Sequence, residues 1–83
     1  MIEITVRYFA AAAAAAVPEE QIRIPVGSSV SDLLFSRASR YGERLAAVLE
    51  RSSFLLDSVA VRNKALVLRN GQILDVLPPF AGG

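Results

Sequence analysis

Ile2-Glu3-Ile4-Thr5-Val6-Arg7-Tyr8 alternates apolar and polar residues without interruption. Successive side chains of a β-strand point to opposite faces, so the four apolar residues of this stretch lie on one face and the three polar residues on the other. The stretch therefore predicts a strand that is buried on one side only. Phe9 follows on the polar side, which predicts an aromatic residue that is either exposed or covered by a loop.

The stretch from Gln21 to Val26 alternates in the same way and predicts a second strand, with Ile22, Ile24 and Val26 facing inward. Pro25 has no amide hydrogen to donate to a neighbouring strand. We therefore expect this strand to lie at an edge of the sheet.

Three stretches predict helices. The alanines of 10–16 predict a short helical connection between the first two strands. Ser29 with Asp32 three residues later resembles a capping box, and Gly42 follows where the principal helix should end. Residues 43–51 predict a shorter helix. The apolar positions of the principal helix recur every three or four residues: Val30, Leu33, Leu34, Ala38 and Tyr41.

The C-terminal half contains the remaining strand signals. Residues 54–56 are predicted to fill the core and residues 59–62 to form a short strand. Asn70-Gly71 predicts a hairpin turn between residues 66–68 and 73–77. Together these elements predict an α+β fold, a mixed sheet of four to five strands with one principal helix across one face and the other face partly open.

Length and composition limit the possible functions. Eighty-three residues predict a single domain, 1–83. The chain has no cysteine and no histidine, which argues against a disulfide framework, a thiolate metal site or self-contained acid–base catalysis, and we expect no bound cofactor or metal. A net charge of +1 is not typical of nucleic-acid binding, and no apolar run is long enough for a membrane helix. We expect a soluble, cytoplasmic protein.

The stretch Leu77-Pro78-Pro79-Phe80-Ala81-Gly82-Gly83 carries the candidate chemistry. The two prolines stop the last strand and hold the segment extended, and the two glycines present no side chain at its tip. An α-carboxylate at Gly83 is ionised at neutral pH and needs external activation before it can react. We therefore predict that Gly83 is the reactive residue, that Gly82 keeps the tip slim, and that partner proteins are bound through a set of apolar residues: Phe80, Pro78, Pro79, Leu77, Ala81 and Phe9.

The chain resembles the ubiquitin-like β-grasp sulfur carriers, the MoaD/ThiS family, and most of all the small subunits of molybdopterin synthase. The resemblance rests on Arg-Tyr-Phe-Ala at the end of the first strand, the alanine-rich connection, the helix start at residues 30–34, the Arg69-Asn70-Gly71 turn and the Pro-Pro-X-X-Gly-Gly tail. Two positions depart from the family pattern. Gln72 stands where members often have an acidic residue, and the alanine run lacks a charged residue.

The resemblance implies a β-grasp fold and a mechanism that uses three partners. An E1-like (MoeB-like) adenylating enzyme would use ATP to convert Gly83 to an acyl-adenylate. A sulfurtransferase would supply the sulfur that turns it into a thiocarboxylate. The large subunit of molybdopterin synthase (MoaE-like) would receive the tail, so that this chain would be a sulfur-donor subunit rather than an enzyme alone.

Three other functions remain open at this point. The same carrier chemistry could serve the synthesis of thiamine thiazole or cysteine. An activated C-terminal glycine could also be transferred to lysines, which would make the chain a ubiquitin-like protein modifier. A β-grasp binding domain with an inert tail is the third alternative, because a fold alone does not imply a function.

Overall fold

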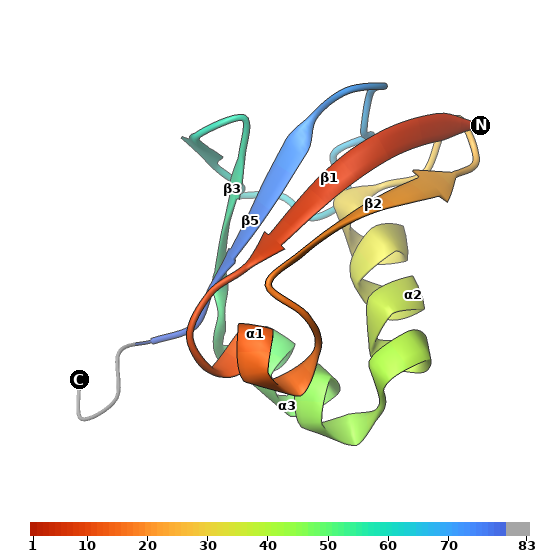
Figure 1. The fold of residues 1–83 in the computed structure, drawn as a ribbon. Helices are drawn as coiled ribbons and strands as arrows, with labels where there is room; N and C mark the ends of the chain where they lie inside the picture. The colour runs from red at the N-terminus through yellow and green to blue at the C-terminus, as the bar shows by residue number, and fades with distance from the viewer. Residues whose placement is uncertain (80–83) are drawn as a thin grey trace.

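The computed structural model describes residues 1–79 of the chain, shown in Figure 1. In chain order the elements are β1 (Ile2–Tyr8), α1 (Ala11–Ala15), β2 (Glu19–Ile24), α2 (Val30–Tyr41), α3 (Glu43–Arg51), β3 (Ser53–Leu56), β4 (Val59–Ala60) and β5 (Ile73–Leu77). The bounds of β1, α2 and α3 are those that the sequence predicts. Within residues 1–79, no helix is both long enough and apolar enough to span a lipid bilayer.

The five strands form one mixed sheet in the order β2-β1-β5-β3-β4. β1 and β5 pair in parallel at its centre, whereas the other three neighbouring pairs are antiparallel. β2 lies at an edge, as Pro25 predicts. The structure therefore confirms an α+β fold with a mixed sheet.

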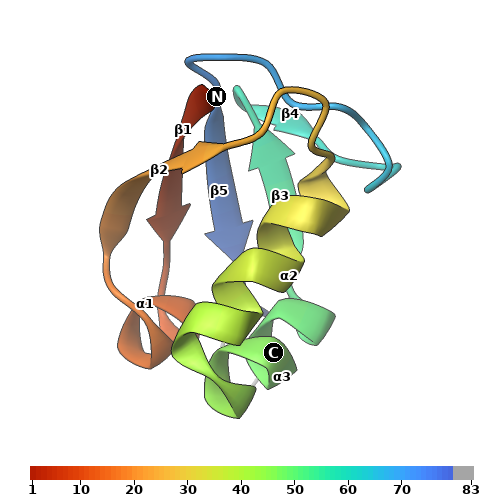
Figure 2. The same ribbon diagram turned by 90° about the vertical axis from the view of Figure 1, so that its right-hand side faces the viewer.

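The helices cover one face of the sheet, and the core lies between the two layers (Figure 2). Ile4 and Val6 of β1 contribute fully buried side chains, which confirms the inward face predicted for the first strand. The largest fully buried side chains come from both layers: Ile4, Val6, Val30, Leu33, Leu45, Leu74 and Val76.

The principal helix α2 begins at a complete capping box. The Ser29 hydroxyl accepts a hydrogen bond from the Asp32 amide, and the Asp32 carboxylate accepts one from the Ser29 amide. Gly42 ends α2 with a φ of 94°, a conformation that favours glycine, and α3 starts directly after it. Ala38 of α2 accepts the hydrogen bond from the Gly42 amide, which closes the last turn.

A polar cluster fixes the edge strand to α2. The Glu20 carboxylate accepts hydrogen bonds from the hydroxyls of Tyr8 (2.6 Å) and Tyr41 (2.8 Å), and from the Arg37 guanidinium at 3.2 Å. Burial and the hydrogen bond to Glu20 raise the pKa of Tyr8, and the same two causes raise the pKa of Tyr41. Both tyrosines therefore stay neutral at physiological pH.

The second strand is shorter than predicted. β2 ends at Ile24, and Val26 is 75% exposed instead of facing the core. Pro25 cannot donate to a ladder, and the Pro25 carbonyl accepts hydrogen bonds from Ser28 that turn the chain towards α2. The prediction for Val26 is wrong because the turn begins two residues earlier than the alternating pattern implies.

The predicted hairpin at Asn70-Gly71 is also wrong, although a turn is present there. The segment 66–68 does not pair with β5; instead the carbonyls of Leu66 and Lys64 accept hydrogen bonds from the amides of Val30 and Ser31. Amides in the first turn of a helix have no partner within the helix, so this segment satisfies two donors of α2. The turn itself is held by β1, because Asn70 and Gly71 both form hydrogen bonds with the Glu3 backbone.

The segment after α3 differs in detail from the prediction. Residues 54–56 lie within β3, where Phe54 and Leu56 are buried but Leu55 is only half-buried on the opposite face. β4 comprises only Val59 and Ala60. The prediction of three core side chains in a row overlooks the alternation that any strand imposes.

Candidate functional site

The face of the sheet that the helices leave uncovered is called the open face here. Its central row crosses three strands, because Arg7 of β1 aligns with Asp75 of β5, and Asp75 aligns with Leu55 of β3. We define the open face by five residues from these strands, together with Phe9, which follows β1: Arg7, Phe9, Leu55, Ile73, Asp75 and Leu77.

An ion pair lies at the centre of the open face. The guanidinium of Arg7 donates two hydrogen bonds to the carboxylate of Asp75, at 2.6 Å and 3.0 Å. These hydrogen bonds, reinforced by the charge of Asp75, raise the pKa of Arg7. Asp75 is only 6% exposed, whereas the Arg7 side chain is 41% exposed and remains accessible.

Apolar side chains flank the ion pair. Ile73, Leu55 and Leu77 are half-buried. Phe9 is 43% exposed, and its amide donates a hydrogen bond to the carbonyl of Val76 at 3.2 Å, so that it continues the pairing of β1 with β5. This mixture of accessible apolar surface and one charged pair is suited to binding another protein.

The chain leaves the sheet beside Phe9. β1 and β5 run parallel, so the ends of both strands lie at the same edge of the sheet. β5 ends at Leu77, after which Pro78 is half-buried and Pro79 is exposed. The structure thus brings together Phe9, Leu77 and the two prolines, while the predicted site residues Phe80, Ala81, Gly82 and Gly83 lie outside the described residues.

The sequence prediction missed the Arg7–Asp75 pair. Asp75 is the one charged residue within Ile73–Leu77, and the alternation of that strand places it on the face opposite Leu74 and Val76. That position signals a polar residue on the open face. Its partner could not be named, because the parallel pairing of β1 with β5 was not predicted.

Two further observations describe the polar side chains of residues 1–79. Within residues 1–79, no group of three or more histidine, cysteine, aspartate or glutamate side chains is arranged to hold a metal ion. No buried side-chain nitrogen or oxygen there lacks a hydrogen-bond partner.

Comparison with known proteins shows which family the chain is similar to. The family model of the ThiS family matches residues 6–83. The search of curated protein sequences gave no significant match.

Several solved structures share the fold. A Pyrococcus furiosus protein assigned as subunit 1 of molybdopterin converting factor is 25% identical, with a TM-score of 0.84 over 96% of this chain and 100% of its own. Small archaeal modifier protein 1 from Haloferax volcanii is 19% identical, with a TM-score of 0.83 over 98% of this chain and 99% of its own.

A third similar structure is a complex of subunits 1 and 2 of the molybdopterin-converting factor from Helicobacter pylori. Its matching chain is 21% identical, with a TM-score of 0.72 over 99% of this chain and 100% of that one. The two matches below 25% identity support the fold alone, which is the β-grasp fold that the sequence resemblance implies. Since the family model covers nearly all of its length, the chain belongs to the ThiS family of ubiquitin-like β-grasp sulfur carriers.

Proposed function

We propose that this chain is the sulfur-carrying small subunit of a molybdopterin synthase. The observation that carries the proposal is the family match, which extends through Gly83 and so includes the Pro-Pro-Phe-Ala-Gly-Gly segment. The proline pair favours molybdopterin synthesis, because the thiamine-pathway carriers that the chain also resembles usually lack it. The 25% identity to a protein assigned as a molybdopterin converting factor subunit supports the same pathway.

The proposed chemistry takes place at Gly83. A carboxylate oxygen attacks ATP bound to an E1-like adenylating enzyme, pyrophosphate leaves, and the glycine becomes an acyl-adenylate. A persulfide of a sulfurtransferase then attacks the acyl carbon and displaces AMP, and a second thiol cleaves the S–S bond of the resulting acyl disulfide, which leaves the thiocarboxylate and a disulfide on the partner side. The large subunit of the synthase accepts this tail, and the sulfur passes to the pterin precursor.

The fold supports a docking mode in which the body stays outside the partner's active site. Six residues follow Leu77, and an extended chain of that length reaches about 20 Å. The open face, at Phe9 and Leu77, borders the point where this segment leaves the sheet. We propose that the open face docks on each partner while the tail enters its active site, with Phe80 as an apolar anchor beyond the prolines.

The test compares the parent chain with a variant that lacks Gly83, using the cognate adenylating enzyme and labelled ATP. The deletion moves the carboxylate by one residue, and misplacement of a reacting group by about 1 Å can lower a rate a hundredfold. We expect adenylation and thiocarboxylate formation to fall by at least that factor. Adenylation and sulfur transfer at the parent rate would exclude Gly83 as the functional residue.

Two controls separate docking from chemistry. The Gly83 deletion should retain the affinity of the parent for the adenylating enzyme, since the open face and Phe80 are unchanged. Phe80→Ala should weaken that affinity by roughly 1–4 kcal/mol, as truncation of a buried interface residue does. It should leave the melting temperature of the free chain unchanged.

Intact mass spectrometry of the protein from its own cells distinguishes a carrier from a modifier. A carrier gains the mass difference between one sulfur and one oxygen atom at Gly83. A modifier forms conjugates in which Gly83 is joined to lysines of other proteins. Conjugates without any thiocarboxylate would overturn the proposed function.

A further inference from the structure

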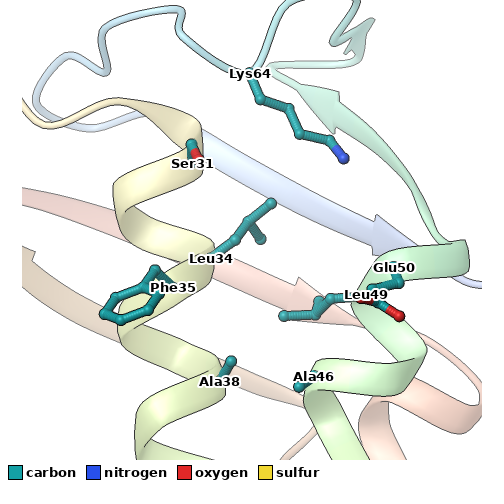
Figure 3. Close-up of a pocket in the computed structure, with 8 residues that line it drawn as sticks. All are labelled: Ser31, Leu34, Phe35, Ala38, Ala46, Leu49, Glu50 and Lys64. Atoms are coloured by element: carbon teal, nitrogen blue, oxygen red, sulfur yellow. The ribbon is translucent and has the colours of Figure 1, made fainter.

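A groove of about 420 Å³ lies between α2 and α3, on the helical side of the molecule. We call it the helix groove. Figure 3 shows the residues that line it: Ser31, Leu34, Phe35, Ala38, Ala46, Leu49, Glu50 and Lys64. It is separate from the open face, which lies on the other side of the sheet.

The centre of the helix groove is apolar. Leu34 and Leu49 point into it from the two helices, and both belong to the hydrophobic core. Ala38 and Ala46 face each other along its lower part and carry only methyl groups. These small side chains leave room for an apolar group from outside.

Phe35 stands at one side of this groove and is 75% exposed. It lies one residue after the buried pair Leu33 and Leu34, so neither the core nor the capping of α2 requires an aromatic ring at this position. An exposed phenylalanine beside an apolar hollow is typical of an interaction site.

Two opposite charges stand on the other side of the groove, away from Phe35. Glu50 projects from α3, and the Lys64 side chain extends over the groove from the loop before β5, with its ammonium 5.2 Å from the centre of the Phe54 ring. Within residues 1–79 neither Glu50 nor Lys64 belongs to an ion pair. α2 contributes only uncharged side chains to the groove.

We propose that the helix groove binds a second copy of this chain in a two-fold symmetric dimer. A two-fold axis requires a self-complementary patch, in which each residue meets its symmetry-related counterpart. The groove carries one positive and one negative charge together, so an axis that exchanges Lys64 with Glu50 forms two ion pairs. Because Phe35 lies across the groove from both charges, the same axis brings the two Phe35 rings together over the alanine-lined hollows.

Other occupants fit the groove less well. A small polar ligand needs convergent polar groups within the pocket, whereas those of the helix groove, Ser31, Glu50 and Lys64, belong to its margins. A strongly charged partner would leave one of the two opposite charges facing a like charge. A second copy satisfies both charges and also covers the exposed ring.

The dimer is compatible with the proposed function but does not depend on it. The described chain end at Pro79 and the helix α2 lie on opposite sides of the molecule (Figure 1). The open face lies on the other side of the sheet from the helix groove, so both open faces would remain accessible in the dimer.

Sedimentation velocity of the full chain over a range of concentrations tests the proposal. The contact is small, so we expect a dissociation constant between about 10 μM and 1 mM. Phe35→Lys should raise this constant at least about tenfold, since it replaces the central apolar contact by two like charges. A parent chain that remains monomeric at about 1 mM would overturn the proposal.

Charge reversal makes the test specific to the geometry. Lys64→Glu and Glu50→Lys each place like charges opposite each other at both symmetry-related positions, so each should weaken the dimer several-fold. The double variant carries both reversals and should regain most of the affinity of the parent. Failure of the double variant to recover, when each single variant folds and is weakened, would exclude the proposed pairing.

Phe9→Lys is the matched control, because Phe9 is an exposed phenylalanine of the open face. It should leave the dimer unchanged. If Phe9→Lys abolishes self-association and Phe35→Lys does not, the copies associate through the open face and the inference is wrong.

Discussion

Arg7 pairs with a buried carboxylate and is itself accessible on the open face. Its two hydrogen bonds neutralise a carboxylate that is almost fully buried, while its own side chain stays accessible on the open face. The loss of Arg7 would leave the charge of Asp75 buried without a partner, which usually costs more than the intact pair contributes.

We therefore predict that Arg7→Met lowers the urea concentration at the midpoint of unfolding at pH 7, because the buried carboxylate of Asp75 loses its partner. Arg23→Met is the control: Arg23 is exposed on the edge strand and belongs to no ion pair within residues 1–79, so its loss should change stability by less than about 0.5 kcal/mol. If the two variants unfold at the same urea concentration, the ion pair between Arg7 and Asp75 does not stabilise the fold.

At the residue scale, alternation in the sequence predicts exposure well only where the strand continues. It places Ile4 and Val6 inside correctly and leaves Phe9 accessible. It fails at Val26, because Pro25 ends the ladder and the turn that follows rotates the next side chains away from the core.

The element α2 depends on the leucines that face the sheet. Leu33 is buried almost completely, and truncation of such a residue to alanine typically costs 2–5 kcal/mol. We predict a loss of that size for Leu33→Ala, measured by urea denaturation at low micromolar protein concentration.

The matched control for this prediction lies on the same helix, two residues away. Phe35→Ala removes a larger side chain, but one that is exposed in the monomer, so stability should change by less than about 0.5 kcal/mol. If Phe35→Ala were the more damaging change, the helix would be rotated relative to the described structure.

At the element scale, prediction succeeds where the signal is local. The capping box and Gly42 fix both ends of α2 from residues within or beside the helix, and the structure confirms both. The Asn70-Gly71 turn is equally local, yet the strand predicted before it fails. The backbone amides of Val30 and Ser31, at the start of α2, donate hydrogen bonds to the carbonyls of Leu66 and Lys64, so this segment does not pair with β5. The sequence of the turn carries no signal for these long-range hydrogen bonds.

The molecule as a whole should lose stability in alkaline solution. Tyr8 and Tyr41 ionise near pH 10 in an unfolded chain, whereas their pKa values are raised in the folded state. Above about pH 10 the unfolded state therefore binds fewer protons than the folded state, and the free energy of unfolding falls as pH rises. The buried Tyr8 contributes most of this slope, because solvent reaches the half-buried Tyr41 and weakens its contribution.

Tyr8→Phe tests the source of this slope. The variant lacks the hydroxyl that donates to Glu20, so it should be about 1 kcal/mol less stable at pH 7 and should lose less stability between about pH 9 and pH 11. Urea denaturation across that range measures both effects. If the free energy of unfolding of the variant falls with pH as steeply as that of the parent, groups other than Tyr8 cause the loss of stability.

At the scale of the molecule, the sequence predicts the class of the fold but not its strand order. Nothing local to Ile2–Tyr8 or Ile73–Leu77 shows that the two strands pair in parallel at the centre of the sheet. The open face, which joins Arg7 to Asp75 across 68 positions of the sequence, follows from that pairing. The site could therefore be anticipated as a tail and one aromatic residue, but not as a surface.

The central position of β5 has a consequence for synthesis on the ribosome. β5 is the last element to emerge, yet both its neighbours, β1 and β3, depend on it for their inner ladders. Contacts between such distant segments form slowly. A nascent chain halted before residue 73 should thus remain open to proteases, and protection should arise abruptly once β5 has left the exit tunnel.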